Sequence, residues 1–295
     1  MIVCIDLGGT SMKVGICSED GQLTDQDILP VHQEVYDLLE EIVNYVMRMK
    51  QKYDIQGIAI SAPGVVDVKT GYVDGCSALK SIHGPKWKEV LFEKLDLPVS
   101  IENDANCAAL AEIIFGKANK YHDMAFMVCG SGIGGAIVKD KKIHHGAHLY
   151  GGEFGCMVME DDDGNISMFS NQASTMSFVH KIQKLYPDQE WNGVKVFEEA
   201  KQGNKDCQKA IDDFYRRLAI GIYNVQHVYD PQIILLGGAI SNREDFIECI
   251  NQKLDELLKI LNTNVVRPLI DTCTFKKDAN LIGAAAHFLQ EQNII

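Results

Sequence analysis

The chain opens with two short apolar runs separated by a glycine turn. Residues 2–7 and 11–17 are mostly apolar, and Gly8-Gly9-Thr10 stands between them. Apolar runs of this length are typical of buried strands, and paired glycines mark tight turns. The pattern predicts a strand, a turn and a returning strand, with a third strand near residues 24–31.

The rest of the first half alternates between helical and strand patterns. Apolar residues recur at helical spacing over 34–53, and 55–61 is an apolar run that Pro63-Gly64 ends. Proline and glycine together interrupt a strand because proline lacks the N–H that a ladder needs. The pattern then predicts a helix at 88–95, a strand at 99–101 and a helix at 106–115 that Gly116 closes.

The hairpin pattern then occurs a second time. Residues 124–129 form an apolar run that meets Gly130-Ser131-Gly132, and 133–138 resumes it before a further strand begins at Ile143. A duplicated strand–turn–strand unit predicts two related α/β halves that face a cleft. We also expect strands at 233–236 and 269–274 and helices at 174–186, 194–229, 244–261 and 280–292.

A length of 295 residues favours two domains. We expect the first domain to consist of 1–117 plus 280–295 and the second to consist of 118–279. No low-complexity linker separates them, so the hinges are expected to be short, with small residues of 280–285 at one of them.

Charge and cysteine content limit the possible classes of protein. The formal net charge is −13 without a Lys/Arg cluster, which disfavours a nucleic-acid partner. The nine cysteines include no C-x-x-C pair, which is typical of thiols in a reducing cytoplasm. The first residues lack a basic signal-peptide region, and no apolar stretch has the length of a membrane span. We therefore expect a cytoplasmic protein with no membrane partner.

Three glycine turns follow apolar strands and are candidate phosphate sites. Glycine lets successive backbone N–H groups approach an anion closely, and a nearby carboxylate suits a hydrated Mg²⁺, which prefers one or two carboxylates plus phosphate oxygens. Any one of these turns is more typical of an ordinary hairpin, but three in this order with a repeated hairpin favour phosphate binding. The candidate residues are Asp6, Gly8, Gly9, Thr10, Lys13, Gly130, Ser131, Gly132, Gly237 and Gly238, with Asp6 next to the Mg²⁺.

Six motifs together resemble the ROK family, which joins repressors, open reading frames and kinases. The resemblance implies an actin-like fold of the ribonuclease H and hexokinase type, with ATP in an interdomain cleft, and usually a homodimer. It implies ATP-dependent phosphorylation of a hexose or hexose derivative, usually on the 6-hydroxyl. The motifs are D-L-G-G-T at 6–10, S-A-P-G-V-V-D at 61–67, E-N-D-A-N at 102–106, G-S-G-I-G-G at 130–135, G-G-E-F-G at 151–155 and L-G-G-A at 236–239.

The same resemblance implies the catalytic and sugar-binding residues. Asp104 follows the strand 99–101 at the start of a helix, where the helix dipole favours an ionised carboxylate. The family match implies that Asp104 is the general base, a role compatible with helix capping by Asn103 or Asp104. Asn103 and Glu153 are implied to bind sugar hydroxyls. Weaker candidates for the sugar pocket are Ser61, Gly64 and His83.

The sequence departs from the family pattern at two places. Cys156 replaces the usual histidine after G-E-F-G, and the cysteine-rich zinc segment that normally follows is missing, so we expect no structural zinc. His144, His145 and His148 could join Cys156 around a metal, but a solvated loop is the favoured interpretation. Ala78 replaces a sugar-contacting asparagine. Both changes affect the part of the family pattern that selects the sugar.

Alternative functions stay open from the sequence. Repressors of the family carry a DNA-binding module before the first phosphate strand, which here begins at Ile2, so we expect a kinase. A sensor that binds sugar or nucleotide without catalysis is the main alternative, and an actin-like ATPase is another. Asp104 and Glu153 favour the kinase, with a β-glucoside, N-acetylmannosamine or glucose as its substrate.

Overall fold

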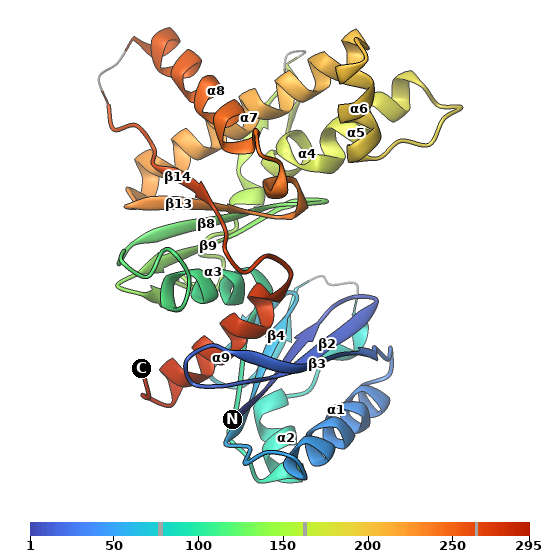
Figure 1. Ribbon diagram of the computed structural model, residues 1–295, viewed down its shortest axis with the longest axis vertical. Helices are drawn as coiled ribbons and strands as arrows, with labels where there is room; N and C mark the ends of the chain where they lie inside the picture. The colour runs from blue at the N-terminus through green and yellow to red at the C-terminus, as the bar shows by residue number, and fades with distance from the viewer. Residues whose placement is uncertain (76–78, 162–163, 263–264) are drawn as a thin grey trace. The chain divides into compact units, whose positions relative to one another are not determined.

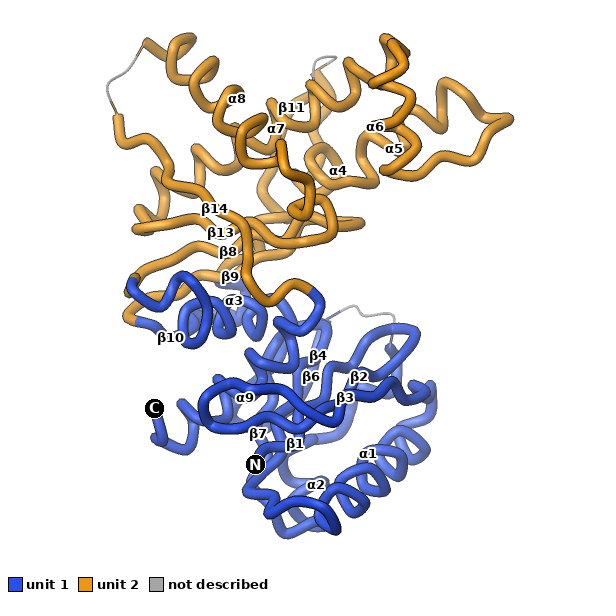
Figure 2. Tube along the Cα trace, viewed as in Figure 1, with its two compact units in different colours: residues 1–120, 141–151, 277–295 blue, residues 121–140, 152–276 orange. Residues whose placement is uncertain are grey.

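Two compact units make up the computed structural model, which describes residues 1–75, 79–161, 164–262 and 265–295 (Figure 2). The first unit comprises Met1–Lys120, Lys141–Gly151 and Lys277–Ile295, and the second comprises Tyr121–Asp140 and Gly152–Lys276. Residues Lys141–Gly151 thus group with the first unit, whereas the sequence pattern puts all of 118–279 in the second domain.

The first sheet has five strands in the order β3-β2-β1-β4-β7 (Figure 1). The three strands of the opening meander pair antiparallel, and β4 and β7 join β1 as parallel strands. The strands are β1 (Ile2–Leu7), β2 (Ser11–Cys17), β3 (Leu23–Pro30), β4 (Gly57–Ala62) and β7 (Val99–Asn103).

Helices cover both faces of this sheet, which explains why every residue of β1 except Asp6 is apolar. Val3 and Ile5 belong to the core under α1 (Val35–Lys50) and α2 (Trp87–Leu95). Ile2 and Cys4 point to the opposite face, because side chains alternate along a strand. There they join the core under α3 (Asp104–Ile114) and α9 (Ala279–Glu291).

The second sheet repeats the strand order of the first, and its pairings β8–β9, β8–β13 and β13–β14 have the same directions as their counterparts. Its order is β10-β9-β8-β13-β14, with β8 and β9 antiparallel and with β8, β13 and β14 parallel. This repetition confirms the predicted α/β fold class, with its duplicated actin-like topology. The strands are β8 (Met124–Cys129), β9 (Ile133–Lys139), β10 (Lys142–Ile143), β13 (Ile233–Gly237) and β14 (Ile270–Thr272).

The second unit buries its apolar core between this sheet and a group of helices. The helical pattern predicted over 194–229 divides into two helices at Gly203, whose φ is +98°. Asn204 then caps the second helix, since its side chain accepts from the backbone N–H groups of Asp206 and Cys207. The helices are α4 (Phe169–Ala173), α5 (Thr175–Leu185), α6 (Gly193–Lys201), α7 (Lys205–Tyr229) and α8 (Phe246–Leu261).

Several short elements were not predicted from the sequence. Two hairpins of three-residue strands occur, and such strands are too short to give a periodic signal. No helix in the described part of the chain has the length and apolarity to cross a bilayer. The short elements are β5 (Val65–Asp67), β6 (Tyr72–Asp74), β11 (Val158–Glu160), β12 (Ile166–Met168), η1 (Lys80–Ile82), η2 (Phe154–Cys156), η3 (Ala239–Asn242) and η4 (Lys276–Asp278).

The packing of α9 on α3 depends on the absence of a side chain at Gly283. A Cβ atom there would lie 1.7 Å from the carbonyl oxygen of Cys107. Gly283→Ala should therefore lower the free energy of unfolding by about 1–3 kcal/mol or more, the usual cost of overpacking. Gly193→Ala at the start of α6 is the control, since its nearest neighbour would be 3.8 Å away. Denaturant unfolding that gives equal stabilities for both variants would contradict this prediction.

Candidate active site

Asp6 is the centre of a polar cluster at the carboxyl end of β1. Its side chain is almost fully buried, and its Oδ1 accepts hydrogen bonds from Ser61 Oγ and Asn280 Nδ2, each at 3.0 Å. Lys13 stands opposite Asp6 in the antiparallel pair of β1 and β2, with its Nζ 3.5 Å from Oδ2. Gly9 and Thr10 lie exposed in the adjoining turn. The cluster thus fixes one carboxylate and one ammonium beside a glycine turn.

Two members of this cluster have roles that the sequence pattern did not indicate. Ser61 is fully buried and donates its hydroxyl proton to Asp6, which favours support of that carboxylate over contact with a sugar. Asn280 was predicted only as part of a hinge, yet its side chain binds Asp6 across 274 positions of sequence.

The turn from β7 into α3 positions Asn103 and Asp104. Asn103 is the N-cap of α3, and its Oδ1 accepts from the backbone N–H groups of Ala105 and Asn106. Its Nδ2 donates to the carbonyl oxygen of Gly64 at 3.0 Å, which leaves one amide proton for a ligand. Asp104 is the first residue of α3, two residues before the predicted helix start, and its Oδ1 accepts from the N–H of Ala105 at 2.8 Å.

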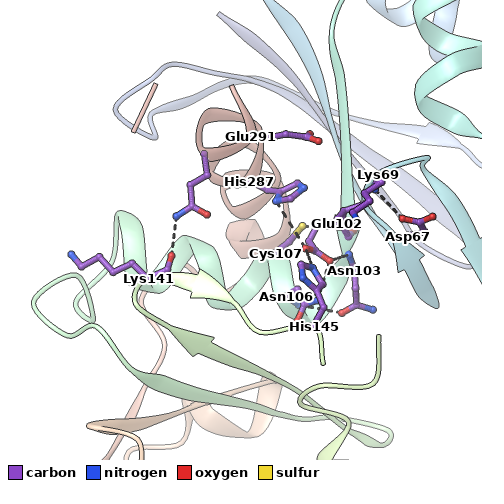
Figure 3. A network of polar contacts seen from close by, with 12 residues as sticks. Asp67, Lys69, Glu102, Asn103, Asn106, Cys107, Lys141, His145, His287 and Glu291 are labelled. Carbon is purple, nitrogen blue, oxygen red and sulfur yellow. Dashed lines mark hydrogen bonds and ion pairs between the residues drawn. The ribbon is translucent and has the colours of Figure 1, made fainter. Parts of the chain in front are cut away.

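Glu102, immediately before this turn, is a fully buried carboxylate held by several donors (Figure 3). Oε1 accepts from the backbone N–H of Asn103 at 2.7 Å and from Asn106 Nδ2 at 2.9 Å. Oε2 lies 2.6 Å from His145 Nε2 and 4.0 Å from His287 Nδ1. We call these five residues the Glu102 network. The sequence motif contains Glu102, but no sequence signal joins it to histidines on a distant loop and on α9.

The hydrogen bond between Glu102 and His145 shifts the pKa values of both groups. Burial alone would raise the pKa of Glu102, but the hydrogen bond from His145 and the nearby charge of His287 hold it below its usual value. The bond to Glu102 raises the pKa of His145, whereas burial lowers the pKa of His287. Both shifts favour the charged forms of the pair, an ionised Glu102 and a protonated His145, beneath the start of α3.

The other predicted sugar residues lie on two different units. His83 donates from Nδ1 to the carbonyl oxygen of Val73 on β6, at 3.0 Å. Glu153 belongs to the second unit and is exposed immediately before η2. Ala78 lies outside the described residues. Among those that are described, no three His, Cys, Asp or Glu side chains converge as metal ligands, and His145 binds Glu102 rather than Cys156.

The remaining two glycine turns come together in the second unit, because they follow the neighbouring parallel strands β8 and β13. The first turn is closed by a bond from Gly130 N to Gly132 O at 2.9 Å, and Thr175 N donates to Gly130 O at 3.0 Å. Gly238 has φ +96°, and a Cβ there would lie 2.0 Å from the carbonyl oxygen of Cys129. Only glycine fits this approach.

A cavity of about 700 Å³ adjoins these turns within the second unit. It has the size and the largely apolar wall typical of a small-molecule site. The sequence analysis missed it, because its wall combines positions of α5, α6 and η3 that are far apart in the chain and share no local motif. The lining residues are Thr175, Met176, Phe178, Val179, Asn192, Gly193, Val194, Lys195, Phe197, Glu198, Lys201, Ala239, Ile240 and Arg243.

Comparisons with known proteins identify the family. The ROK family model matches residues 2–291. A beta-glucoside kinase of Listeria monocytogenes is 32% identical over 99% of this chain and 98% of its own length, and one of Klebsiella pneumoniae is 32% identical over 98% and 96%. The crystal structure of a ROK family protein from Streptococcus pneumoniae in complex with sucrose superposes with a TM-score of 0.91 at 36% identity, covering 100% of this chain and 99% of that one. The chain belongs to the ROK family, and these relatives place it among the family's sugar kinases.

The Glu102 network predicts a pH-dependent contribution to stability. Because the folded state raises the pKa of His145, the added stability is fully present below the unfolded pKa of about 6.5 and is lost as the pH rises through the folded value. In Glu102→Gln, the pKa of His145 should fall towards 6.5, as followed by NMR titration of its imidazole. The stability advantage of the natural protein over this variant should then shrink as the pH rises from about 6.5 through the raised pKa of His145.

Glu93→Gln is the matched control for this experiment, because Glu93 is an exposed carboxylate of α2 that lies outside the network. It should leave the titration of His145 unchanged. An unaltered His145 titration in Glu102→Gln as well would show that the pair is not an ion pair in solution.

Proposed function

We propose that this protein transfers the γ-phosphate of ATP to a hydroxyl of a hexose unit, most simply the 6-hydroxyl, with Asp104 as general base. The observation that supports this best is the position of Asp104 in the first turn of α3. There its carboxylate is partly buried, and it follows the N-cap residue that binds the Gly64 loop. The helix dipole favours the ionised form that a base requires.

Phosphoryl transfer mainly requires that the reactants be positioned and that the developing charge be stabilised, because the reaction passes through a loose transition state. Asp104 accepts the proton of the attacking sugar hydroxyl, and the N–H of Ala105 holds its Oδ1 in place. Asn103 donates its remaining amide proton to a ring hydroxyl, while Glu153 accepts two vicinal hydroxyls. Gly64 and His83 complete the sugar pocket in this proposal.

The nucleotide is assigned to both sets of glycine turns. The 700 Å³ cavity of the second unit suits the adenosine, next to the N–H groups of the turns at 130–132 and 237–238. Mg²⁺ bound to ATP takes most of its ligands from phosphate and water and needs only one or two carboxylates, so Asp6 fits that role. Ser61 and Asn280 hold Asp6, and Lys13 supplies a positive charge for the phosphates. Mg²⁺ would neutralise phosphate charge when bound.

The relatives support the choice of substrate class in this proposal. Two full-length relatives are named beta-glucoside kinases, and a similar structure holds sucrose. We therefore favour a β-glucoside over N-acetylmannosamine and glucose as the natural substrate. A homodimer remains the expected assembly from the family resemblance.

Asp104→Asn tests the catalytic assignment. Removing the base should lower kcat by about 10²–10⁴-fold while the dissociation constant of the sugar changes little, because the amide keeps the shape of the carboxylate. Steady-state ADP release and calorimetric sugar binding measure the two quantities.

Asp37→Asn is the matched control, since Asp37 is also an acidic residue in the first turn of a helix. Both substitutions remove about 0.3–1 kcal/mol of dipole stabilisation, and only the one at Asp104 should affect turnover. Retained turnover in Asp104→Asn would refute the assignment.

Ala239→Leu tests the nucleotide assignment. Ala239 lines the 700 Å³ cavity from η3, and a leucine there fills part of that volume. The KM for ATP should rise at least about tenfold, while the KM for the sugar changes less than about twofold, because the sugar is assigned to residues outside this cavity. Equal changes in both constants would contradict a dedicated nucleotide cavity.

A further inference from the structure

A second cavity, of about 340 Å³, lies within the first unit and has no role in the proposed reaction. One wall is the hairpin of β5 and β6, and the other is the loop before Gly151. We call this cavity the hairpin groove. It is lined by Val65, Asp67, Tyr72, Asp74, Gly75, His148, Leu149 and Tyr150.

The lining of the hairpin groove has the chemistry of a sugar-binding surface. Tyr72 and Tyr150 are 41% and 58% exposed, so their rings offer apolar faces with a hydroxyl at the edge. Asp67 and Asp74 add carboxylate acceptors for hydroxyl groups. Two carboxylates in one small cavity disfavour a phosphate or another anion, so the lining favours a neutral polyol ring.

Both carboxylates are fixed before any ligand arrives. Asp67 accepts from Lys69 N at 3.0 Å and from Thr70 Oγ1 at 2.8 Å, and Asp74 accepts from Gly75 N at 2.7 Å. Each oxygen has further lone-pair capacity for a ligand hydroxyl. Fixed acceptors reduce the entropy that binding would otherwise cost.

The opposite wall is held in an uncommon backbone conformation. Leu149 has φ +64°, in the left-handed region of backbone conformations. Bulky residues rarely adopt this region, which is more common for asparagine and aspartate. The loop is closed by a bond from Gly151 N to His145 O at 2.9 Å, and His145 is anchored on Glu102. Such strain persists only where surrounding contacts enforce it, and it is concentrated at ligand sites.

The hairpin groove adjoins the sugar-binding residues of the proposed function. Asn103 Nδ2 donates to Gly64 O, and the next residue, Val65, begins β5 and lines the groove. Glu102, the residue before Asn103, anchors the opposite wall through His145. One strand end thus fixes both the proposed base and the two walls of the groove.

We propose that the hairpin groove is a subsite for the second ring of a β-linked disaccharide whose first ring is phosphorylated at Asp104. This inference rests on the proposed function. A volume of about 340 Å³ is near the lower limit of roughly 300–1,000 Å³ for ligand pockets, which suits one ring and not a macromolecule. The groove therefore selects substrates with an uncharged sugar at the position of the aglycone.

The test compares cellobiose, a β-linked glucose disaccharide, with glucose. Steady-state kinetics with ATP are measured for the natural protein, for Tyr72→Ala, for Tyr150→Ala and for the double variant. We expect kcat/KM for cellobiose to fall at least tenfold in the double variant, while kcat/KM for glucose stays within twofold. Tyr36→Ala is the matched control, because Tyr36 is 68% exposed on α1 and lies outside the groove. Thermal unfolding confirms that each variant folds.

The outcomes separate this inference from the proposed function. Loss of both activities in equal proportion, or loss of neither, overturns the subsite and leaves the kinase standing. Turnover of a monosaccharide by the natural protein, without turnover or binding of cellobiose, also overturns the subsite.

If the natural protein phosphorylates no sugar, the proposed function fails and calorimetry decides the subsite alone. Cellobiose binding that weakens at least tenfold in the double variant, but not in Tyr36→Ala, then supports it. Absent or unchanged binding overturns it.

Discussion

The buried carboxylate of Glu102 is the interaction on which the proposed sugar site depends. An isolated charge in a protein interior costs several kcal/mol, so the fold must supply donors for both oxygens. It does so with the backbone of Asn103, the side chain of Asn106 and the imidazole of His145. These donors come from the start of α3 and from a remote loop. The hydrogen bonds to the Glu102 carboxylate therefore position the helix that holds Asp104. They also position the loop that forms one wall of the hairpin groove.

The sheet topology brings the polar residues of the first unit to one edge. The parallel strands β1, β4 and β7 are adjacent, and their register aligns Asp6 with Ser61 and Ser61 with Glu102. Ligand sites in open α/β sheets form at the carboxyl ends of parallel strands. The second sheet applies the same rule with backbone groups instead of side chains, because its strands β8 and β13 end in glycine turns. One unit thus offers carboxylates and amides, and the other offers N–H donors beside an apolar cavity.

This division of chemistry is consistent with the difference between the two ligands of a sugar kinase. A sugar presents hydroxyl groups, which require acceptors and donors at fixed positions, as Asn103 and the carboxylates of the hairpin groove provide. A nucleotide presents an apolar base and a charged phosphate chain, which require a wide apolar wall and convergent N–H groups. The duplicated fold reaches both solutions with the same strand order, because the differences lie in the loops and not in the sheets.

Sequence patterns alone predicted the long elements and the repeated fold, whereas the contacts that hold the site became visible only in the folded structure. Continuous apolar runs such as 2–7 and 124–129 identify strands buried on both faces, and each is followed by a glycine turn. Local patterns also indicated α3 and its capping by Asn103 or Asp104; Asn103 is the N-cap, and the helix begins at Asp104, two residues before the predicted start. The partnership of Glu102 with His145, the bond from Asn280 to Asp6 and the hairpin groove could not be predicted. Periodicity reports which face of an element is apolar, whereas contacts between polar residues far apart in the chain depend on packing that no local pattern records.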